Sequence, residues 1–287
     1  MIAERRIEMV LQTIKVIDAH THVFPDKIAD KSRNYVGGFY GLPMYTIGTS
    51  KELTKVSHES RMIGGKEYKI THQLICSPAV TALQTDSINE YISELVKSDS
   101  SLIGFGTLHP DNENFEEIID SIIDSGLKGI KFHSDFQRFN IDDKKMYPIY
   151  KYASQKDLPV LFHMGDEKLD FSRPFRLARV IEDIPDLKII AAHAGGYSHW
   201  DESINLPVSD NLYFDISSSL KFISKEQLTE FLERFGYTHF FFGSDFPMWN
   251  PYDEIERFIS LGFDEEIQRA IEFDNFSRFI GLNTVSG

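Results

Sequence analysis

The chain has 287 residues, of which 41% are hydrophobic and 13% aromatic, so it carries enough apolar side chain for one sizeable core. Its net charge of −14 argues against nucleic acid or an anionic membrane as a partner, because both attract basic surfaces. No apolar stretch reaches the roughly 18 residues of a membrane span and no apolar leader opens the sequence, so we expect a cytoplasmic protein. The single cysteine, Cys76, excludes an intramolecular disulfide and favours a buried structural thiol.

Short apolar runs rich in β-branched and aromatic residues alternate along the chain with segments of helical periodicity. This alternation is typical of parallel sheets built from strand–helix–strand units. Strands are expected at 15–22, 70–77, 102–108, 128–133, 159–163, 188–193, 212–217 and 238–244. Helices are expected at 86–97, 113–125, 144–155, 174–183 and 225–235, and after the last strand from Tyr252 and over 264–280.

This succession predicts a (β/α)8 (TIM) barrel, with an open, doubly wound sheet as the alternative. No repeat, low-complexity tract or linker divides the chain, so one domain over 1–287 is expected. The connection over 23–69 is far longer than the usual handful of residues. It contains a Pro/Gly/aromatic-rich piece at 35–45 and an amphipathic helix expected near 51–62. We expect this insertion to lie over the barrel mouth as a lid or a binding wall.

Two histidines end the first expected strand. His20 and His22 lie two residues apart, so the strand period of two points both rings to the same side, where they can share one ion. Asp18 shares that face and is expected to orient a ligand histidine. Taken alone, a pair of this spacing is often fortuitous.

Other polar residues stand at the ends of later expected strands. His163 ends the fifth, His193 ends the sixth, and Asp245 follows the eighth. A closed barrel brings its first and last strands side by side, which sets Asp245 beside His20 and His22. Polar groups at the mouth of apolar strands need partners, and a metal ion is such a partner. The sequence therefore predicts a metal centre at this end of the barrel.

These motifs resemble the amidohydrolase superfamily, and within it the amidohydrolase-related (amidohydrolase 2) group of metal-dependent hydrolases, lactonases and decarboxylases such as aminocarboxymuconate semialdehyde decarboxylase. The resemblance covers nearly the whole chain. It rests on Asp-Ala-His-Thr-His at 18–22, Gly-Ile-Lys-Phe-His at 129–133, the stretch 142–150, Pro-Val-Leu-Phe-His-Met-Gly at 159–165, Ala-His-Ala-Gly-Gly at 192–196 and Gly-Ser-Asp-Phe-Pro at 243–247.

The resemblance implies a division of roles among the strand-end residues. His20, His22, His163 and Asp245 would hold one divalent ion, with zinc as the first choice and manganese or cobalt as alternatives. His193 would act as acid or base, with Asp245 able to take the proton of the water.

Further residues near the strand ends are expected to bind substrate: Lys131, His133, Arg138 and His109. In related binuclear enzymes a lysine at the place of Lys131 bridges two ions as a carbamate, but the group that this chain resembles is mononuclear. His109 and His133 have an equal claim to be structural hydrogen-bonding groups. The arginines after the fourth and fifth strands, Arg138, Arg173 and Arg176, are candidates for gripping a substrate carboxylate.

A site of three histidines and one carboxylate leaves room for a water, whose pKa zinc lowers toward about 7. The sequence therefore predicts a hydrolase that acts on a small ester, lactone or amide, with a carboxylate on the substrate. A non-oxidative decarboxylase of an aromatic or dienoic acid is the close alternative, and a metal-binding barrel without turnover is the third. We expect a small anionic molecule as the partner and keep a homodimer open.

Overall fold

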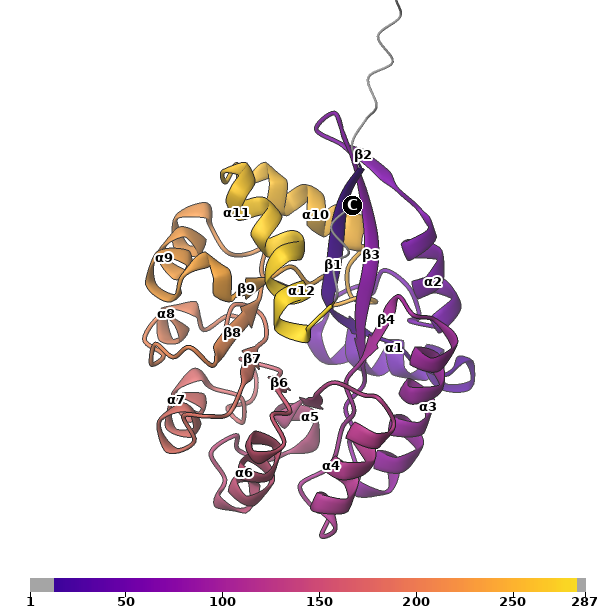
Figure 1. Ribbon diagram of the computed structural model, residues 1–287, viewed down its shortest axis with the longest axis vertical. Coiled ribbons are helices and arrows are strands. Elements are labelled where there is room, and N and C mark those ends of the chain that lie inside the picture. Colours follow the sequence, from indigo (N-terminus) through magenta and orange to yellow (C-terminus); the bar gives the residue numbers. More distant parts are fainter. Residues whose placement is uncertain (1–12, 283–287) are drawn as a thin grey trace, which may run out of the picture.

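The computed structural model describes residues 13–282, which form a ring of parallel strands with helices around it (Figure 1). The strands of the ring are β1 Thr13–His22, β3 Lys66–Cys76, β4 Leu102–Gly104, β5 Ile130–Phe132, β6 Val160–Phe162, β7 Ile189–Ala191, β8 Leu212–Asp215 and β9 Phe240–Phe241. They pair in that order in two runs, β1–β3–β4 and β5 to β9. The N-terminal segment, where we expected no apolar leader, lies outside the described residues.

Two short contacts close the ring between these runs. A parallel bridge joins Gly106 to Ile130 on one side, and another joins Thr21 to Phe246 on the other. Beside the second bridge, the Ala19 amide donates to the Phe242 carbonyl at 2.9 Å. The predicted (β/α)8 barrel is therefore confirmed.

The helices follow the strands as the sequence predicts. Those between strands are α3 Thr85–Ser98, α4 Phe115–Asp124, α5 Ser134–Gln137, α6 Tyr147–Gln155, α7 Pro174–Asp183, α8 Trp200–Ser203 and α9 Lys225–Phe235, and α10 Pro251–Ser260 follows β9. The bounds of α7 and α9 match the expected ones, because Pro174 stands at the first helical position and Ser224 caps α9 with Gln227 in a capping box.

The long connection between β1 and β3 contains more regular structure than the sequence predicted. It holds α1 Asp26–Tyr40 and α2 Ser50–His58, and β2 Arg61–Ile63 then forms a hairpin with the start of β3. Half of the Gly- and aromatic-rich piece belongs to α1, which ends at Gly41 in a left-handed conformation that glycine adopts without strain. The helix expected over 51–62 stops at His58, because the chain turns there into the hairpin.

The two faces of the strands separate two apolar clusters. Alternate residues such as Val160 and Phe162 pack outward against the helices in the larger cluster. Leu161 and Ile190, which pair in register with each other and with Lys131, belong to the smaller cluster on the inner face. The apolar part of the interior thus gives way to polar residues toward the carboxyl ends of the strands. None of the helices in residues 13–282 is both long and apolar enough to cross a membrane.

The final helical segment, expected to be continuous over 264–280, is broken into α11 Glu265–Arg269, a π-helical turn Ala270–Asp274 and α12 Asn275–Ile280. In the turn, the Ile271 carbonyl accepts a hydrogen bond from the Phe242 amide at 2.8 Å, which ties the segment to the end of β9. Glu272 lies in the same turn, is 2% exposed and has an unpaired carboxyl oxygen. Burial raises the pKa of Glu272 to about 8, so its carboxyl is protonated at neutral pH.

Glu272→Gln should therefore stabilise the protein increasingly as pH rises. Between an unfolded pKa near 4.5 and a folded pKa of about 8, the unfolded chain releases a proton that the native chain keeps, so the wild type loses stability across this window. The variant cannot ionise. We expect its free energy of unfolding to match that of the wild type at about pH 5 and to exceed it by about 2 kcal/mol at about pH 8. Urea unfolding at several pH values measures this, with the exposed Glu256→Gln as control. A difference that stays constant with pH would contradict it.

Candidate metal centre

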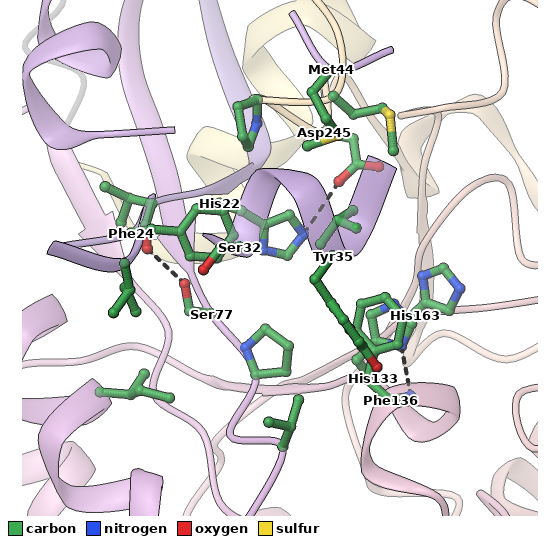
Figure 2. A pocket seen from close by; sticks show the side chains of 18 of the residues that line it. His22, Phe24, Ser32, Tyr35, Met44, Ser77, His133, Phe136, His163 and Asp245 are labelled. Atoms are coloured by element: carbon green, nitrogen blue, oxygen red, sulfur yellow. Dashed lines mark hydrogen bonds and ion pairs between the residues drawn. The ribbon is translucent and has the colours of Figure 1, made fainter. Parts of the chain in front are cut away.

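Five of the nine predicted site residues come together at the carboxyl ends of the strands, on one wall of a cavity of about 830 Å³. His22, His163, His193 and Asp245 line this cavity, as does His133. Figure 2 shows His22 and Asp245 facing each other, with His163 and His133 on the neighbouring wall. The residues that the sequence placed at separate strand ends thus share one space.

The carboxylate of Asp245 lies between the first two histidines. Its Oδ1 is 3.2 Å from His22 Nε2 and 3.9 Å from His20 Nε2. Bonds of about 2.1 Å place neighbouring ligand atoms of a tetrahedral ion about 3.4 Å apart, so these separations suit a shared ion. Although burial alone would raise it, the pKa of Asp245 is held well below its ordinary value by the hydrogen bond with His22 and by the nearby histidines.

Each of the four central histidines has one ring nitrogen engaged with an acceptor outside the centre. The pairs are His20 Nδ1 with Asp215 Oδ2 at 2.9 Å, His22 Nδ1 with the Cys76 carbonyl at 3.2 Å, His163 Nε2 with the Gly165 carbonyl at 2.9 Å, and His193 Nδ1 with the Ser217 carbonyl at 2.9 Å. Carbonyls and carboxylates accept, so these nitrogens carry the hydrogen. In a neutral ring the other nitrogen then holds a lone pair, which is the arrangement of metal-binding histidines. His22 differs, because although burial alone would lower it, its pKa is raised to about 9 by Cys76 and by the hydrogen bond with Asp245, so its Nε2 carries a proton that a metal ion would displace.

The lone pairs of His163 and His193 face each other. His163 Nδ1 and His193 Nε2 are 3.0 Å apart, and each ring already donates on its other side. Two lone pairs at this distance need a shared proton or a cation. Burial lowers the pKa of both histidines, which disfavours the proton. This pair of ring nitrogens therefore fits a bound metal ion.

Lys131 lies deeper than the sequence predicted. It is fully buried on the inner face, does not line the cavity, and places Nζ 2.9 Å from His20 Nε2. Burial lowers its pKa, and burial together with the nearby Lys131 charge lowers the pKa of His20 to about 4. The neutral ring of His20 can then act as a ligand. Lys131 is thus positioned to influence the protonation of His20 and not to contact a ligand in the cavity.

His133 belongs to the cavity wall. Its Nδ1 accepts the Phe136 amide at 3.4 Å, so its Nε2 is the donor, and Nε2 lies 3.2 Å from the Tyr40 hydroxyl. The ring also stacks on His163 with centroids 3.8 Å apart. The Nε2–H of His133 has no backbone acceptor among these contacts and suits a hydrogen bond to a ligand. The expectation that His133 binds substrate remains a prediction with this support.

The other predicted substrate-binding residues lie away from the cavity. His109 is buried beside Asp111, whose amide donates to its Nδ1 at 3.2 Å. Arg138 is exposed, Arg173 pairs with Glu202, and Arg176 pairs with Asp142 and Asp170. No arginine in residues 13–282 lines the cavity, because the acidic partners of these arginines lie on the outer loops and helices. A substrate-binding role for His109 and Arg138 therefore has no support in this geometry.

Comparison with known proteins assigns the family. The sequence profile described as amidohydrolase matches residues 17–282. The chain belongs to the amidohydrolase family.

Solved structures agree with this assignment in fold. An uncharacterised TIM-barrel protein from Bordetella bronchiseptica is 17% identical, with a TM-score of 0.72 over 93% of this chain and 99% of that one. A dihydroxybenzoic acid decarboxylase from Polaromonas sp., with bound manganese and the inhibitor 2-nitroresorcinol, is 14% identical, with a TM-score of 0.70 over 94% and 98%. A candidate 2-pyrone-4,6-dicarboxylic acid hydrolase from Pseudomonas putida is 17% identical, with a TM-score of 0.65 over 93% and 98%.

Two residues of this amidohydrolase's centre escaped the sequence reasoning. Asp215 at the end of β8 is fully buried and orients the ring of His20, the role we expected of Asp18. Asp18 instead accepts from the amide and hydroxyl of Ser244 and so fixes the turn before Asp245. The sequence did contain an indication of Asp215, because a charged residue stands there near the end of an apolar strand. Tyr40 gave no signal, because only the path of α1 brings it to His133 and His163.

The backbone at the centre departs from ordinary strand geometry. His193 and Asp245 have φ values of 60° and 58°, which place both in the left-handed region. Residues other than glycine rarely occupy this region, and its cost is of order 1–3 kcal/mol where the surroundings hold it. Both residues leave the strand ladder in this way. The strand expected over 188–193 consequently overran β7, because His193 turns into the mouth instead of continuing the sheet.

His22→Ala is expected to abolish tight metal binding, because it removes the histidine nitrogen nearest to Asp245. Metal analysis of the wild type after loading should return about one ion per chain. Loading at 100 times the dissociation constant should stabilise the wild type by about 2.7 kcal/mol and leave the variant unchanged. Thermal unfolding with and without zinc measures this, and His58→Ala, on the exposed end of α2, is the control.

Two ions per chain would instead support a carbamate on Lys131. Equal metal content in His22→Ala and the wild type would contradict the ligand assignment.

Proposed function

We propose that this amidohydrolase is a hydrolase that opens an ester, lactone or amide bond with a metal-activated water. The observation that carries the proposal is that acceptors orient one ring nitrogen of His20, His22, His163 and His193 at the carboxyl ends of the strands, beside the ionised carboxylate of Asp245, and that all of these residues except the fully buried His20 line one cavity.

The residues proposed to hold the ion are His20, His22, His163 and Asp245. When bound, the ion supplies a Lewis acid for the substrate carbonyl and a water of lowered pKa. Zinc is our first choice, with manganese and cobalt as alternatives. Of these alternatives we favour manganese, because the structurally similar decarboxylase from Polaromonas binds it.

His193 is the proposed proton carrier. The Ser217 carbonyl fixes its Nδ1–H, so Nε2 is the atom that can take a proton from water and later give it to the leaving group. Burial lowers the pKa of His193, which keeps the ring neutral and ready to act as a base at neutral pH. Asp245 can share this work, because Ser218 holds its Oδ2 at 2.6 Å and Trp249 holds Ser218 in turn.

Tyr40 and His133 are proposed to orient the substrate. Their hydroxyl and Nε2 lie within 3.2 Å of each other beside His163, and Tyr40 comes from α1, which covers the mouth. A carbonyl or ring oxygen placed between them would accept from both. The connection over 23–69 would thus act as the binding wall that the sequence predicted.

Decarboxylation is the second candidate, and the decarboxylases among the similar structures are its support. The lining of the cavity favours hydrolysis, because no arginine of the described residues is there to grip a carboxylate. For the same reason the proposal does not require the carboxylate that the sequence analysis placed on the substrate. Membership of an enzyme family speaks against the third reading, a metal-binding barrel without turnover.

Oxygen-18 labelling separates the two reactions. With a panel of esters, lactones and aromatic acids, we expect turnover to place one oxygen from labelled water in the acid product, because hydrolysis adds water across the bond. Mass spectrometry of the product measures the label, and headspace analysis measures carbon dioxide. Release of carbon dioxide without label in the product would reverse the order of the two candidates.

His193→Ala should lower kcat by about 10²- to 10⁴-fold, because it removes the proton carrier, while the zinc content stays near that of the wild type. Steady-state kinetics and metal analysis on the same samples measure both quantities. His199→Ala, a half-buried histidine whose ring contacts the Asp166 carbonyl outside the centre, is the matched control. Unchanged kcat in His193→Ala would refute the role of His193 in turnover.

A further inference from the structure

The cavity extends well beyond the metal centre. The histidines and Asp245 form only its inner wall, and the rest lies between the facing sides of α1 and α3 and the segment after β3. Figure 1 shows α1 and α3 near each other beside β4, and Figure 2 shows Ser32 and Tyr35 of α1 among the lining residues drawn around His22. We call the part lined by α1 with the preceding Phe24, by α3 and by the segment after β3 the outer channel. The total of about 830 Å³ lies toward the upper end of the range of roughly 300–1,000 Å³ for small-molecule sites.

The outer channel is apolar. Phe24, Ile28, Val36, Val80 and Ile88 line it. Two of these side chains are exposed in spite of their character, Ile28 by 41% and Val80 by 38%, and Tyr35 beside them is 56% exposed. Exposed apolar side chains that gather on one concave wall mark a surface that a ligand or partner covers. Their continuity with His22 and Asp245 in one cavity points to the ligand of that centre.

The charged residues of the outer channel favour neither an anionic nor a cationic ligand. Its cations are Lys27 and Lys31 on α1, and its anions are Glu90 and Glu94 on α3, all of them exposed. Two charges of each sign at the rim leave no net field to select an anionic or a cationic tail. Apolar contact is therefore the main interaction that the outer channel offers.

We propose that the substrate carries an apolar alkyl or aryl group that fills the outer channel while its ester, lactone or amide carbonyl lies at the metal centre. This inference rests on the proposed hydrolase function for the position of the carbonyl. It adds a substrate class, since a compact acid would leave the space between α1 and α3 unused. Burial of the group removes both its own surface and that of Ile28, Tyr35 and Val80 from water.

A chain-length series tests the proposal without a known substrate. Straight-chain hydroxamic acids, from acetohydroxamic to octanohydroxamic acid, present one metal-binding head and a tail of increasing length. Calorimetric titration of the full chain, with and without zinc, should give an affinity that rises by up to about fourfold for each CH₂ that becomes buried. The tail contacts no metal, so we expect the same slope in both forms, with zinc raising all affinities by a common factor.

The two proposals fail in different ways in this experiment. Affinity that does not change with chain length would overturn the outer channel as a tail site, whatever zinc does. Affinity that rises with chain length but is indifferent to zinc would leave the tail site standing and count against the metal centre.

Ser32→Trp narrows the outer channel from the α1 side, because Ser32 is a small, half-buried lining residue. We expect the slope with chain length to fall toward zero in this variant. Asn34→Trp adds the same bulk to an exposed position of α1 that does not line the cavity, and it should keep the slope of the wild type. Equal slopes in the two variants would overturn the proposal. So would a wild-type dimer that Ser32→Trp dissociates and that binds no tail, because a second copy of the chain would then cover this face.

Discussion

Closure of the strand ring between β1 and β9 is the constraint on which the rest of the structure depends. The Ala19 and His22 amides donate to the carbonyls of Phe242 and Phe246, and the Asp245 amide donates back to His20. Backbone hydrogen bonds of this kind must be satisfied in a buried seam, so the two ends of the chain are held in register. This register brings the carboxylate of Asp245 to the rings of His20 and His22, which lie at the opposite end of the sequence.

A shell of hydrogen-bond acceptors outside the centre orients these rings as possible metal ligands. Asp215 and the carbonyls of Cys76, Gly165 and Ser217 each take one ring hydrogen, so that the remaining lone pairs face inward. Burial lowers the pKa of His20, His163 and His193, since charging them in an apolar interior is costly, whereas Cys76 and Asp245 raise the pKa of His22 to about 9 in spite of its burial. The shell therefore sets the direction of the histidine rings. His133 is the exception, because its backbone partner, the Phe136 amide, is a hydrogen-bond donor.

Chemistry and recognition come from different parts of the fold. The strand ends supply the proposed metal ligands and proton carrier, and they are fixed by the barrel. The connection between β1 and β3 supplies α1, and with it Tyr40 and much of the cavity wall. Barrels commonly divide their work in this way, because loops can vary without disturbing the strands. The reaction class is accordingly read from the strand ends, and the substrate class from α1 and α3.

The sequence by itself determined the barrel, most of its helices and the strand-end positions of the central residues. These features follow from local patterns, namely the periods of strands and helices and the caps of α7 and α9. Only the tertiary structure decided which acid orients His20, because Asp18 within β1 and Asp215 at the end of β8 are both buried and the choice depends on the facing partner. It also decided that Arg173 and Arg176 bind outer acids, and that Tyr40 reaches the centre. Such pairings join residues distant in the chain, and no local period encodes them.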